Sequence, residues 1–496
     1  MTAFSGCAAG VGKVAKVPAA TGPVARAAPE VRRLPEVQQA QHAEPVDVST
    51  DAVEVMPRSI TDATPSGVTA SGLWDLTQVL ASVDRNNPRI GIAGERYREA
   101  YARLAAARAL WLPSIRAGAS FNKHEGTLQA SNGGVADNSR TALNAGLGVQ
   151  AIGAGSPIVP GVFANFHLRD AVFQPKIADH RAQATLEASR TVTNDLRLSA
   201  ALAYLELLRA KQQLAITSET VANAETLVQT TGEFARVGQG LQADADRART
   251  ELAIRANDVL RAEEAIQTAS AQLTELLSLD PSVTIEVAEE TLIPLDLVDV
   301  AKEPGALIAL GLSNRPELAE ARHLVCETVH RYERERFAPL LPSVLLGVSY
   351  GGFGGSDHAD IRNFRDRFDL DGVAFWELRN LGLGERAARD EASARLQQER
   401  LREVQLLDQV AREIMQAHAQ VTIRQRQITQ AEQAIQAATD SYQRNVSRIR
   451  EGQGLPLETL QSLQALDQAR REYLRVVADY NEAQFRLHRA LGWPIE

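Results

Sequence analysis

Two histidines, a cysteine and a glutamate between positions 323 and 330 have the clearest chemical potential in this sequence. His323, Cys326, Glu327 and His330 are spaced so that a helix would bring them toward one face, and all are possible ligands of a transition metal. A segment of similar pattern at 88–110 has no such residues at matching places. We therefore interpret the group as an ordinary helix surface and expect neither a metal nor another cofactor.

Two glycine-rich stretches raise the question of nucleotide binding. GLGVQAIGAG at 146–155 and YGGFGG at 350–355 contain GxG fragments, but neither lies between a predicted strand and a predicted helix. The sequence contains no G-x-x-x-x-G-K-[ST] phosphate loop, no G-x-S-x-G and no H-E-x-x-H. We interpret both stretches as glycines of loops or strand edges, and we expect no enzymatic activity.

The composition favours long helices and argues against nucleic acid as a partner. Only 5% of the 496 residues are aromatic, so Ala, Leu and Val must fill most of the interior. The net charge of −9 opposes phosphate binding, which needs clustered Lys and Arg. The sequence has no apolar run of the length that a transmembrane helix needs.

The first 70 residues are rich in Ala, Pro, Val and Thr and show no periodic apolar pattern, so we expect an extended lead segment. Cys7 follows FSG, which is similar to the end of a bacterial lipoprotein signal. Few residues precede Cys7, so either the start is truncated or the match arises by chance. Lipidation of Cys7 is the expectation that we retain.

Short phrases recur at a spacing of nearly half the chain. Each has a proline or glycine that begins or ends a predicted helix. The matched pairs are NNPRI and NRPEL, WLPSI and LLPSV, VGQG and EGQG, and SLDP and LGWP. They predict a tandem repeat, with a first unit at 71–281, a linker at 282–303 and a second unit at 304–496.

Each unit is expected to contain two short helices, two strands and a long helical hairpin. Alternating apolar residues predict strands at 115–122, 162–169, 344–350 and 368–378, joined within each unit by 124–160 and 351–364. Continuous helical patterns predict long helices at 176–237, 241–279, 385–450 and 455–491, with Leu198, Leu202, Leu205 and Leu208 as a coiled seam.

The four strands have the length that a tilted strand needs to cross a bilayer. Four strands cannot close a barrel, and an open sheet edge is not tolerated in lipid, so copies of the chain would have to share one barrel. Three copies would supply twelve strands. Trp376, near the end of the last strand, is interpreted either as a membrane-interface aromatic or as ordinary strand packing.

The order of these phrases, with QADADRARTEL after VGQG and LPLETLQSLQALDQAR after EGQG, resembles the TolC family of outer-membrane efflux proteins over about 73–494. The resemblance implies a mainly α fold in a homotrimer, with a shared twelve-stranded barrel in outer-membrane lipid and a periplasmic α-barrel of long antiparallel helices. It also implies a passive exit duct of a tripartite efflux or type I secretion system. Its partners would be a periplasmic adaptor (membrane fusion) protein and an inner-membrane pump.

The resemblance further implies which residues do this work. It assigns two helix-turn-helix tips to adaptor docking: Gly238, Gly240, Leu241, Gly452, Gly454 and Leu455. Glycine suits such turns because it adopts positive φ without a Cβ penalty. Glu458, with Asp244 and Asp246, would lie at the pore entrance, where three copies of Glu458 would favour cations. The second acidic position of the family falls on Gln461.

Two alternatives to this interpretation stay open. The acidic residues after each turn lie in the first turn of a helix, where the helix dipole alone favours them. The whole chain could also be a soluble coiled-coil scaffold or tether, which would explain the helices but not the alternating strands.

Overall fold

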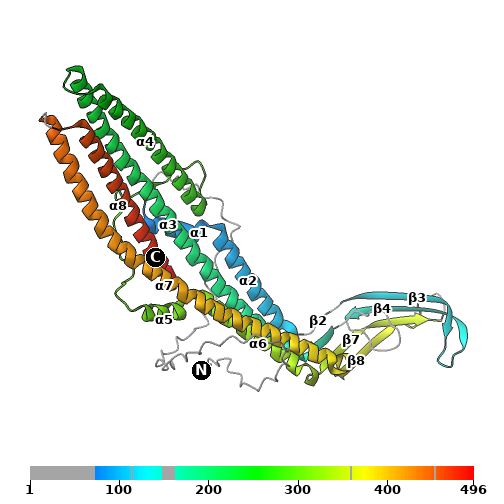
Figure 1. Ribbon diagram of the computed structural model, residues 1–496. Coiled ribbons are helices and arrows are strands. Elements are labelled where there is room, and N and C mark those ends of the chain that lie inside the picture. Colours follow the sequence, from blue (N-terminus) through cyan, green and yellow to red (C-terminus); the bar gives the residue numbers. More distant parts are fainter. Residues whose placement is uncertain are drawn as a thin grey trace, which may run out of the picture. The chain divides into compact units, whose positions relative to one another are not determined.

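The computed structural model describes residues 73–112, 114–115, 117–147, 162–357, 360–451 and 454–495. The expected lead segment at 1–70, including Cys7, lies outside the described residues, as does Gly452. Figure 1 shows the order of the helices and strands along the chain.

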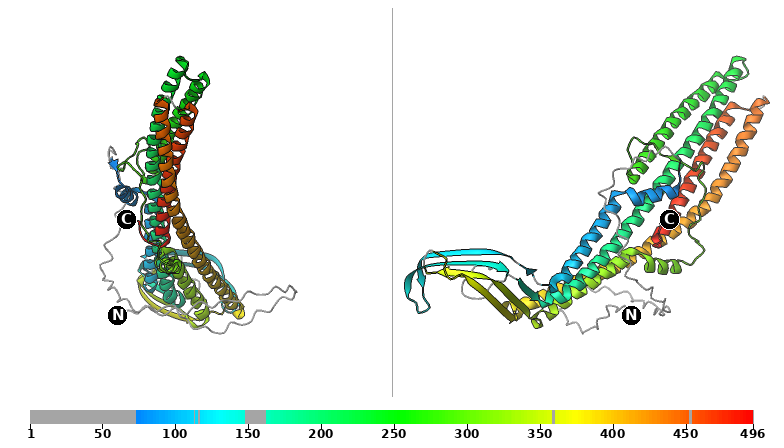
Figure 2. Two further views of the ribbon diagram at one scale, coloured as in Figure 1. Left: turned by 60° about the vertical axis from the view of Figure 1, so that its left-hand side comes forward. Right: turned by 180° about the vertical axis from the view of Figure 1, so that it is seen from behind.

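Four long helices make up most of the described chain: α3 (Leu168–Arg236), α4 (Gln242–Leu277), α7 (Leu383–Arg450) and α8 (Pro456–Ala490). All four predicted long helices are confirmed, and seven of their eight ends fall within two residues of the expected position, the exception being the start of α3. With 69 residues, α3 is about 100 Å long. Figure 2 shows from two further sides that the four helices run alongside one another.

Two pairs of shorter helices precede the strands: α1 (Leu76–Asn86) with α2 (Pro88–Arg108), and α5 (Pro304–Asn314) with α6 (Pro316–Phe337). Asn87 caps α2, because its side chain accepts a hydrogen bond of 2.9 Å from the Arg89 backbone N–H. Single 3₁₀ turns follow at η3 (Ala109–Trp111), η4 (Ala338–Leu340) and η5 (Arg379–Gly382). The same order of short helices, strands and long helices therefore occurs twice along the chain.

The main sheet contains six strands: β2 (Ser114–Ile115), β3 (Ala117–Gln129), β4 (Val135–Leu147), β5 (Val162–His167), β7 (Ser343–Ser356) and β8 (Arg365–Phe375). A separate parallel pair joins β1 (Leu73–Trp74) to β6 (Glu286–Val287). All pairings in the main sheet are antiparallel.

These six strands occupy only four rows, because β4 and β5 lie end to end along the same edge of β7. Leu147 at the end of β4 pairs with Tyr350, and Val162 at the start of β5 pairs with Val348, only two residues away on β7. β3 and β2 in turn pair with β4 and β5. The sheet therefore has two rows from each half of the chain.

The prediction that 124–160 only connects two strands was wrong. β3 continues to Gln129 and β4 occupies Val135–Leu147, joined by a tight turn in which Gly133 has a φ of +85°. The side chains of this hairpin are mostly polar, so its strands lack the alternating apolar pattern from which strands were predicted. Backbone hydrogen bonds between β3 and β4 hold the hairpin together. The strand predicted at 162–169 also ends earlier, at His167, where α3 begins directly.

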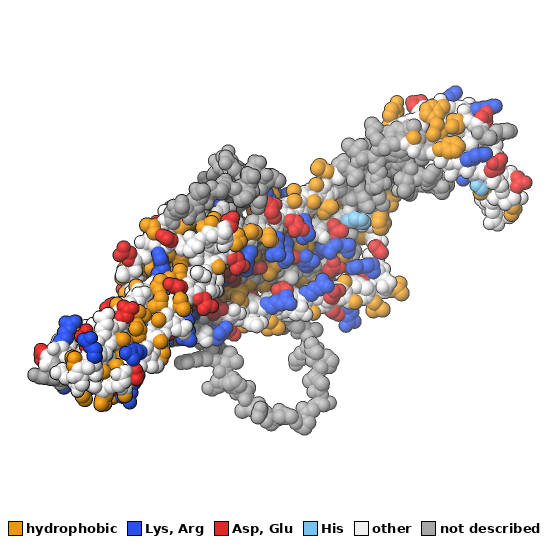
Figure 3. All heavy atoms as spheres, turned by 90° about the horizontal axis from the view of Figure 1, so that it is seen from above, with side chains coloured by type: hydrophobic (Ala, Val, Ile, Leu, Met, Phe, Trp, Pro, Cys, Tyr) orange, Lys and Arg blue, Asp and Glu red, His pale blue; other side chains and the backbone are white. Residues whose placement is uncertain are grey.

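One face of the sheet exposes apolar side chains in cross-strand pairs. Val348 lies opposite Leu370, and Tyr350 lies opposite Phe368. Tyr350 is 61% exposed and Phe368 is 64% exposed. Figure 3 shows hydrophobic side chains gathered over the sheet, at the right of the view, whereas acidic and basic side chains are interspersed over the helices. An exposed apolar patch of this kind is typical of a surface that binds a protein or a membrane.

The principal core lies where the long helices meet, with Leu207, Leu273, Ile414 and Leu487 all fully buried. The predicted seam contributes to it: Leu205 and Leu208 are buried, and Leu198 and Leu202 pack against them partly buried. Within the described residues, no helix is long and apolar enough to cross a membrane.

Side chains of α8 hold the segment between the two halves. The backbone N–H groups of Leu295 and Val298 donate hydrogen bonds of 2.8 and 3.0 Å to the side chains of Asn481 and Gln484. The hydroxyl of Tyr480 donates to Asp296, and burial together with this hydrogen bond raises the pKa of Tyr480 to about 12. Buried polar side chains therefore fix the path of this segment.

Candidate functional site at the hairpin turns

The two hairpin turns, between α3 and α4 and between α7 and α8, share a backbone hydrogen bond. In the first turn the Gly240 N–H donates to the carbonyl of Phe234 at 3.0 Å. In the second turn the Gly454 N–H donates to the carbonyl of Arg448 at 2.9 Å. Both bonds span six residues, and each satisfies a carbonyl that the end of the helix would otherwise leave unpaired.

The glycines of these turns are required for two different reasons. Gly238 has a φ of +75°, which confirms the expected use of glycine in the left-handed region. Gly240 and Gly454 do not have positive φ, and they are needed because the backbone passes close to the preceding helix. A Cβ on Gly240 would lie 3.0 Å from the Phe234 Cβ, and one on Gly454 would lie 2.7 Å from the Ile449 nitrogen.

Apolar side chains stand exposed around both turns. Leu241 and Leu455 occupy the equivalent residue just before α4 and α8, and they are 69% and 61% exposed. Val237 and Leu457 beside them are exposed as well. We call these four residues the tip surface. Four exposed apolar side chains at the ends of polar helices form a place where another protein can dock.

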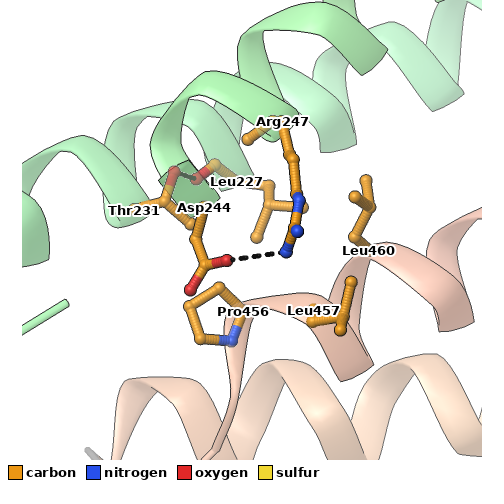
Figure 4. Close-up of a pocket in the computed structure, with 8 residues that line it drawn as sticks. Leu227, Thr231, Asp244, Arg247, Pro456, Leu457 and Leu460 are labelled. Carbon is orange, nitrogen blue, oxygen red and sulfur yellow. Dashed lines mark hydrogen bonds and ion pairs between the residues drawn. The ribbon is translucent and has the colours of Figure 1, made fainter. Parts of the chain in front are cut away.

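The tip surface rests on a small second core that joins the two hairpins. Leu227 of α3, Ala248 of α4 and Ile449 of α7 are buried together, and Leu460 of α8 packs against them. Figure 4 shows the narrow cavity at this junction, into which Pro456 and Leu457 face from one hairpin and Thr231 from the other. The turns are therefore held as one unit rather than as two separate loops.

The three carboxylates predicted at the pore entrance all have arginine partners. Asp244 is mostly buried and lies 3.3 Å from Arg247, as Figure 4 shows. Asp246 is exposed and pairs with Arg249. Glu458 lies 3.2 Å from Arg448, at the end of the preceding helix. In a single chain these arginines offset the acidic charge, so Glu458 and Arg448 must be considered together.

A buried network of ion pairs links the hairpins along α4 and α8. The Arg255 guanidinium lies 2.7 Å from Glu251, 3.3 Å from Asp258 and 2.8 Å from Asp467. Asp467 is only 4% exposed, and it also accepts hydrogen bonds from Thr220 and Arg471. The sequence analysis missed this network, because nothing in the sequence indicates that residues 212 positions apart meet.

Two other sequence candidates, Glu327 and the glycines at 351–355, are engaged in contacts within the chain, and the stretch at 148–155 lies outside the described residues. Glu327 is bound by Arg331 and Arg181, so it is not a free ligand. In the described part of the chain, no group of three or more His, Cys, Asp or Glu side chains could hold a metal ion. The glycines at 351–355 belong to β7, where the Phe364 ring lies over Gly352 and Gly354.

Comparison with solved structures shows that the chain has the fold of outer-membrane channels. It is similar to the outer membrane channel CmeC of Campylobacter jejuni (16% identity, 85% of this chain and 86% of that chain, TM-score 0.71). It is also similar to the outer membrane protein VceC of Vibrio cholerae (18%, 85% and 97%, 0.70). The MtrE outer membrane channel of Neisseria gonorrhoeae is 17% identical, with 85% of this chain and 89% of that chain covered and a TM-score of 0.67. No family model matches the sequence, and no curated protein matches it significantly. The resemblance seen in the sequence is confirmed at the level of the fold.

Proposed function

We propose that this protein is one subunit of a trimeric outer-membrane channel that serves as the exit duct of a tripartite efflux or type I secretion system. The observation that carries the proposal is a sheet with an exposed apolar face that continues directly into helices of about 100 Å. The sheet would lie in the outer membrane, and the helices would extend through the periplasm. The duct is passive, without cofactor or nucleic acid, and an inner-membrane pump drives transport through a periplasmic adaptor.

Three chains are the number that the sheet favours. Each chain supplies four rows, and in the described part of the sheet β3 and β8 each pair on one side only. An unpaired strand edge is costly in lipid, because nothing there replaces its hydrogen bonds. Twelve rows from three chains would close a barrel of a size found in outer membranes, and the long helices would continue it as an α-barrel.

We retain the division of the chain as part of the proposal. A lead segment at 1–70, lipidated at Cys7, precedes a first structural repeat at 71–281, a linker at 282–303 and a second repeat at 304–496. The repeated order of elements supports this tandem arrangement.

We assign the tip surface and the turn glycines, including Gly452, to docking of the adaptor. Exposed Leu241 and Leu455 give the docking surface its apolar character, and the close-packed turns keep it rigid. The alternative of a soluble coiled-coil scaffold is disfavoured by the exposed pairs Tyr350–Phe368 and Val348–Leu370, which water would cover at a cost.

The channel proposal is tested on the full chain purified in detergent. The mass of the protein, after subtraction of the detergent, should equal three chains, and planar bilayers that receive it should show discrete conductance steps. Monodisperse monomers that remain in aqueous buffer after detergent removal, without conductance in bilayers, would contradict the proposal and favour the scaffold.

Glu458 and Arg448 give a prediction about the pore entrance. If three copies of Glu458 face the pore, Glu458→Ala should lower the cation-over-anion permeability ratio by roughly twofold or more, because three negative charges leave the entrance. Arg448→Ala should raise the ratio, since it frees the same carboxylate. The measurement is the reversal potential of single channels in a salt gradient.

Asp440→Ala is the matched control for Glu458→Ala, because Asp440 is another exposed acid near the same turn and pairs with Arg444. It should leave the permeability ratio unchanged. Equal ratios in all three variants and the parent would remove Glu458 from the pore entrance while leaving the channel proposal intact.

A further inference from the structure

Three histidines that are remote in the sequence meet between α3 and α6. Nδ1 of His180 on α3 lies 3.3 Å from Nδ1 of His323 on α6. The ring of His180 also stacks on that of His330, with centroids 5.3 Å apart and an interplanar angle of 20°. His323 and His330 are seven residues apart on α6, two turns along one face, so His180 lies against both. We call these three residues the histidine cluster.

The cluster lies in a contact between the two halves of the chain. α3 belongs to the first half and α6 to the second, and the two helices pack along each other. Nearer the sheet, the rings of Phe173 and Phe337 stack at 6.2 Å, and Asp170 pairs with Arg334 at 2.6 Å. The histidine cluster is therefore one of several contacts that join α3 to α6, among them the ion pair between Arg181 and Glu327, and imidazoles change their charge near neutral pH.

Few carboxylates around the cluster are free to balance added positive charge. The charged and titratable groups near it come from α2, α3 and α6: Arg108, Asp179, Arg181, Glu320, Cys326, Glu327, Arg331 and Glu333.

Most of these carboxylates already face arginines. Asp179 lies 3.7 Å from Arg108. Glu327 lies 2.6 Å from Arg331. Glu333 is the acid bonded to a histidine of the cluster, at 2.9 Å from Nδ1 of His330. One protonated imidazole thus has a counterion within hydrogen-bond distance, and further protonation would place like charges against each other.

The surroundings disfavour a charge on His180. Burial, followed by repulsion from His330 and His323, lowers the pKa of His180 below its ordinary value of 6.5, although Asp179 and Glu327 oppose the shift. An unfolded or separated His180 binds a proton more readily than the packed one. The contribution of packed, neutral His180 to stability is therefore fully present above about pH 6.5. It declines as the pH falls from there through the lowered pKa of the packed residue.

We propose that the histidine cluster makes the contact between α3 and α6 sensitive to pH, so that the two helices are closely packed at neutral pH and separate locally in acid. The charge that drives the separation is a second proton on stacked imidazoles. The proposal does not depend on what the channel transports, and it would hold for the isolated protein in detergent.

Amide hydrogen exchange of the full-length protein tests this proposal at pH 7.5 and pH 5.0, after correction for the intrinsic pH dependence of exchange. We expect peptides covering 173–185 and 320–333 to lose protection severalfold at pH 5.0, because added protons would place like charges on imidazoles that are packed against one another. Peptides covering 198–208, in the core away from the cluster, should stay equally protected at both values.

Two variants decide whether the histidine cluster causes the loss of protection at pH 5.0. The triple variant His180→Gln/His323→Gln/His330→Gln should keep its protection at pH 5.0, whereas His180→Arg should show the acid behaviour already at pH 7.5. His124→Gln in β3, outside the cluster, is the control and should behave like the parent. Unchanged protection of the parent at pH 5.0, or equal losses in the parent and the triple variant, would overturn the proposal. If the triple variant does not fold, the parent and His180→Arg decide the question.

Discussion

Replacing Arg255 with methionine is expected to lower the free energy of unfolding by about 3–5 kcal/mol, which is the usual cost of removing one partner from a buried ion pair. Arg255 is 15% exposed and contacts three carboxylates, on Glu251, Asp258 and Asp467. Without it Glu251 loses its arginine partner, and Asp258 and Asp467 lose one of the two arginines that they share, the other being Arg471. The size of methionine preserves the packing of the aliphatic stem, so the loss would report on charge.

Arg249→Met is the matched control, because Arg249 also lies on α4 and pairs with an acid, Asp246, at 2.9 Å. It is 58% exposed, and an exposed pair contributes about 1 kcal/mol or less. Urea unfolding of both variants in detergent, followed by circular dichroism, gives the comparison. Losses of equal size in the two variants would show that burial of the Arg255 network adds nothing to stability.

Gly492→Ala is expected to be the second large effect, lowering the free energy of unfolding by about 2–5 kcal/mol. Gly492 follows α8 with a φ of +77°, where a side chain costs about 1–2 kcal/mol. A Cβ there would also lie 2.7 Å from the carbonyl carbon of Asn314 and 2.8 Å from the Arg315 nitrogen. Because these are backbone atoms between α5 and α6, they cannot yield as a flexible side chain would, and crowding adds about 1–3 kcal/mol.

Ser278→Gly provides an opposite change at the end of α4, in the first half of the chain. Ser278 ends α4 with a φ of +52°, a conformation that suits glycine better than serine. After the entropic cost of glycine, we expect this substitution to raise the free energy of unfolding by about 0.5–1 kcal/mol. Losses in both variants would show that backbone conformation does not decide stability at these helix ends.

The contacts of Gly492 also explain why the proline phrases recur. In the second half, NRP lies against the end of α8, where Gly492 touches Asn314 and Arg315. In the first half, the Asn87 side chain of NNP donates a hydrogen bond of 2.9 Å to the Leu276 carbonyl at the end of α4. Each phrase therefore begins one helix and fixes the end of the helix that returns to it.

The sequence predicted the long helices well and the sheet only in part. Glycine and proline mark helix ends directly, so α7 and α8 begin and end within two residues of their predicted bounds. β4 was missed because its pattern is polar and its pairing with β3 depends on hydrogen bonds that any sequence can make.

The candidate sites also fall into two groups, those that local sequence predicts and those that form only when distant segments pack together. The turn at Gly238 could be predicted, because local conformation alone requires glycine there. The histidine cluster could not, since His180 and His323 are 143 residues apart and meet only through the packing of α3 on α6. Sequence spacing had drawn attention to His323 and His330 but gave no reason to include His180.

The end-to-end arrangement of β4 and β5 has a practical consequence for engineering. Leu147 and Val162 are anchored to β7 residues only two positions apart, roughly 7 Å along the strand. The pairing of β4 and β5 with β7 therefore does not depend on the length of the segment between Leu147 and Val162. An epitope or a protease recognition sequence grafted between them should leave the register of β4 and β5 on β7 intact.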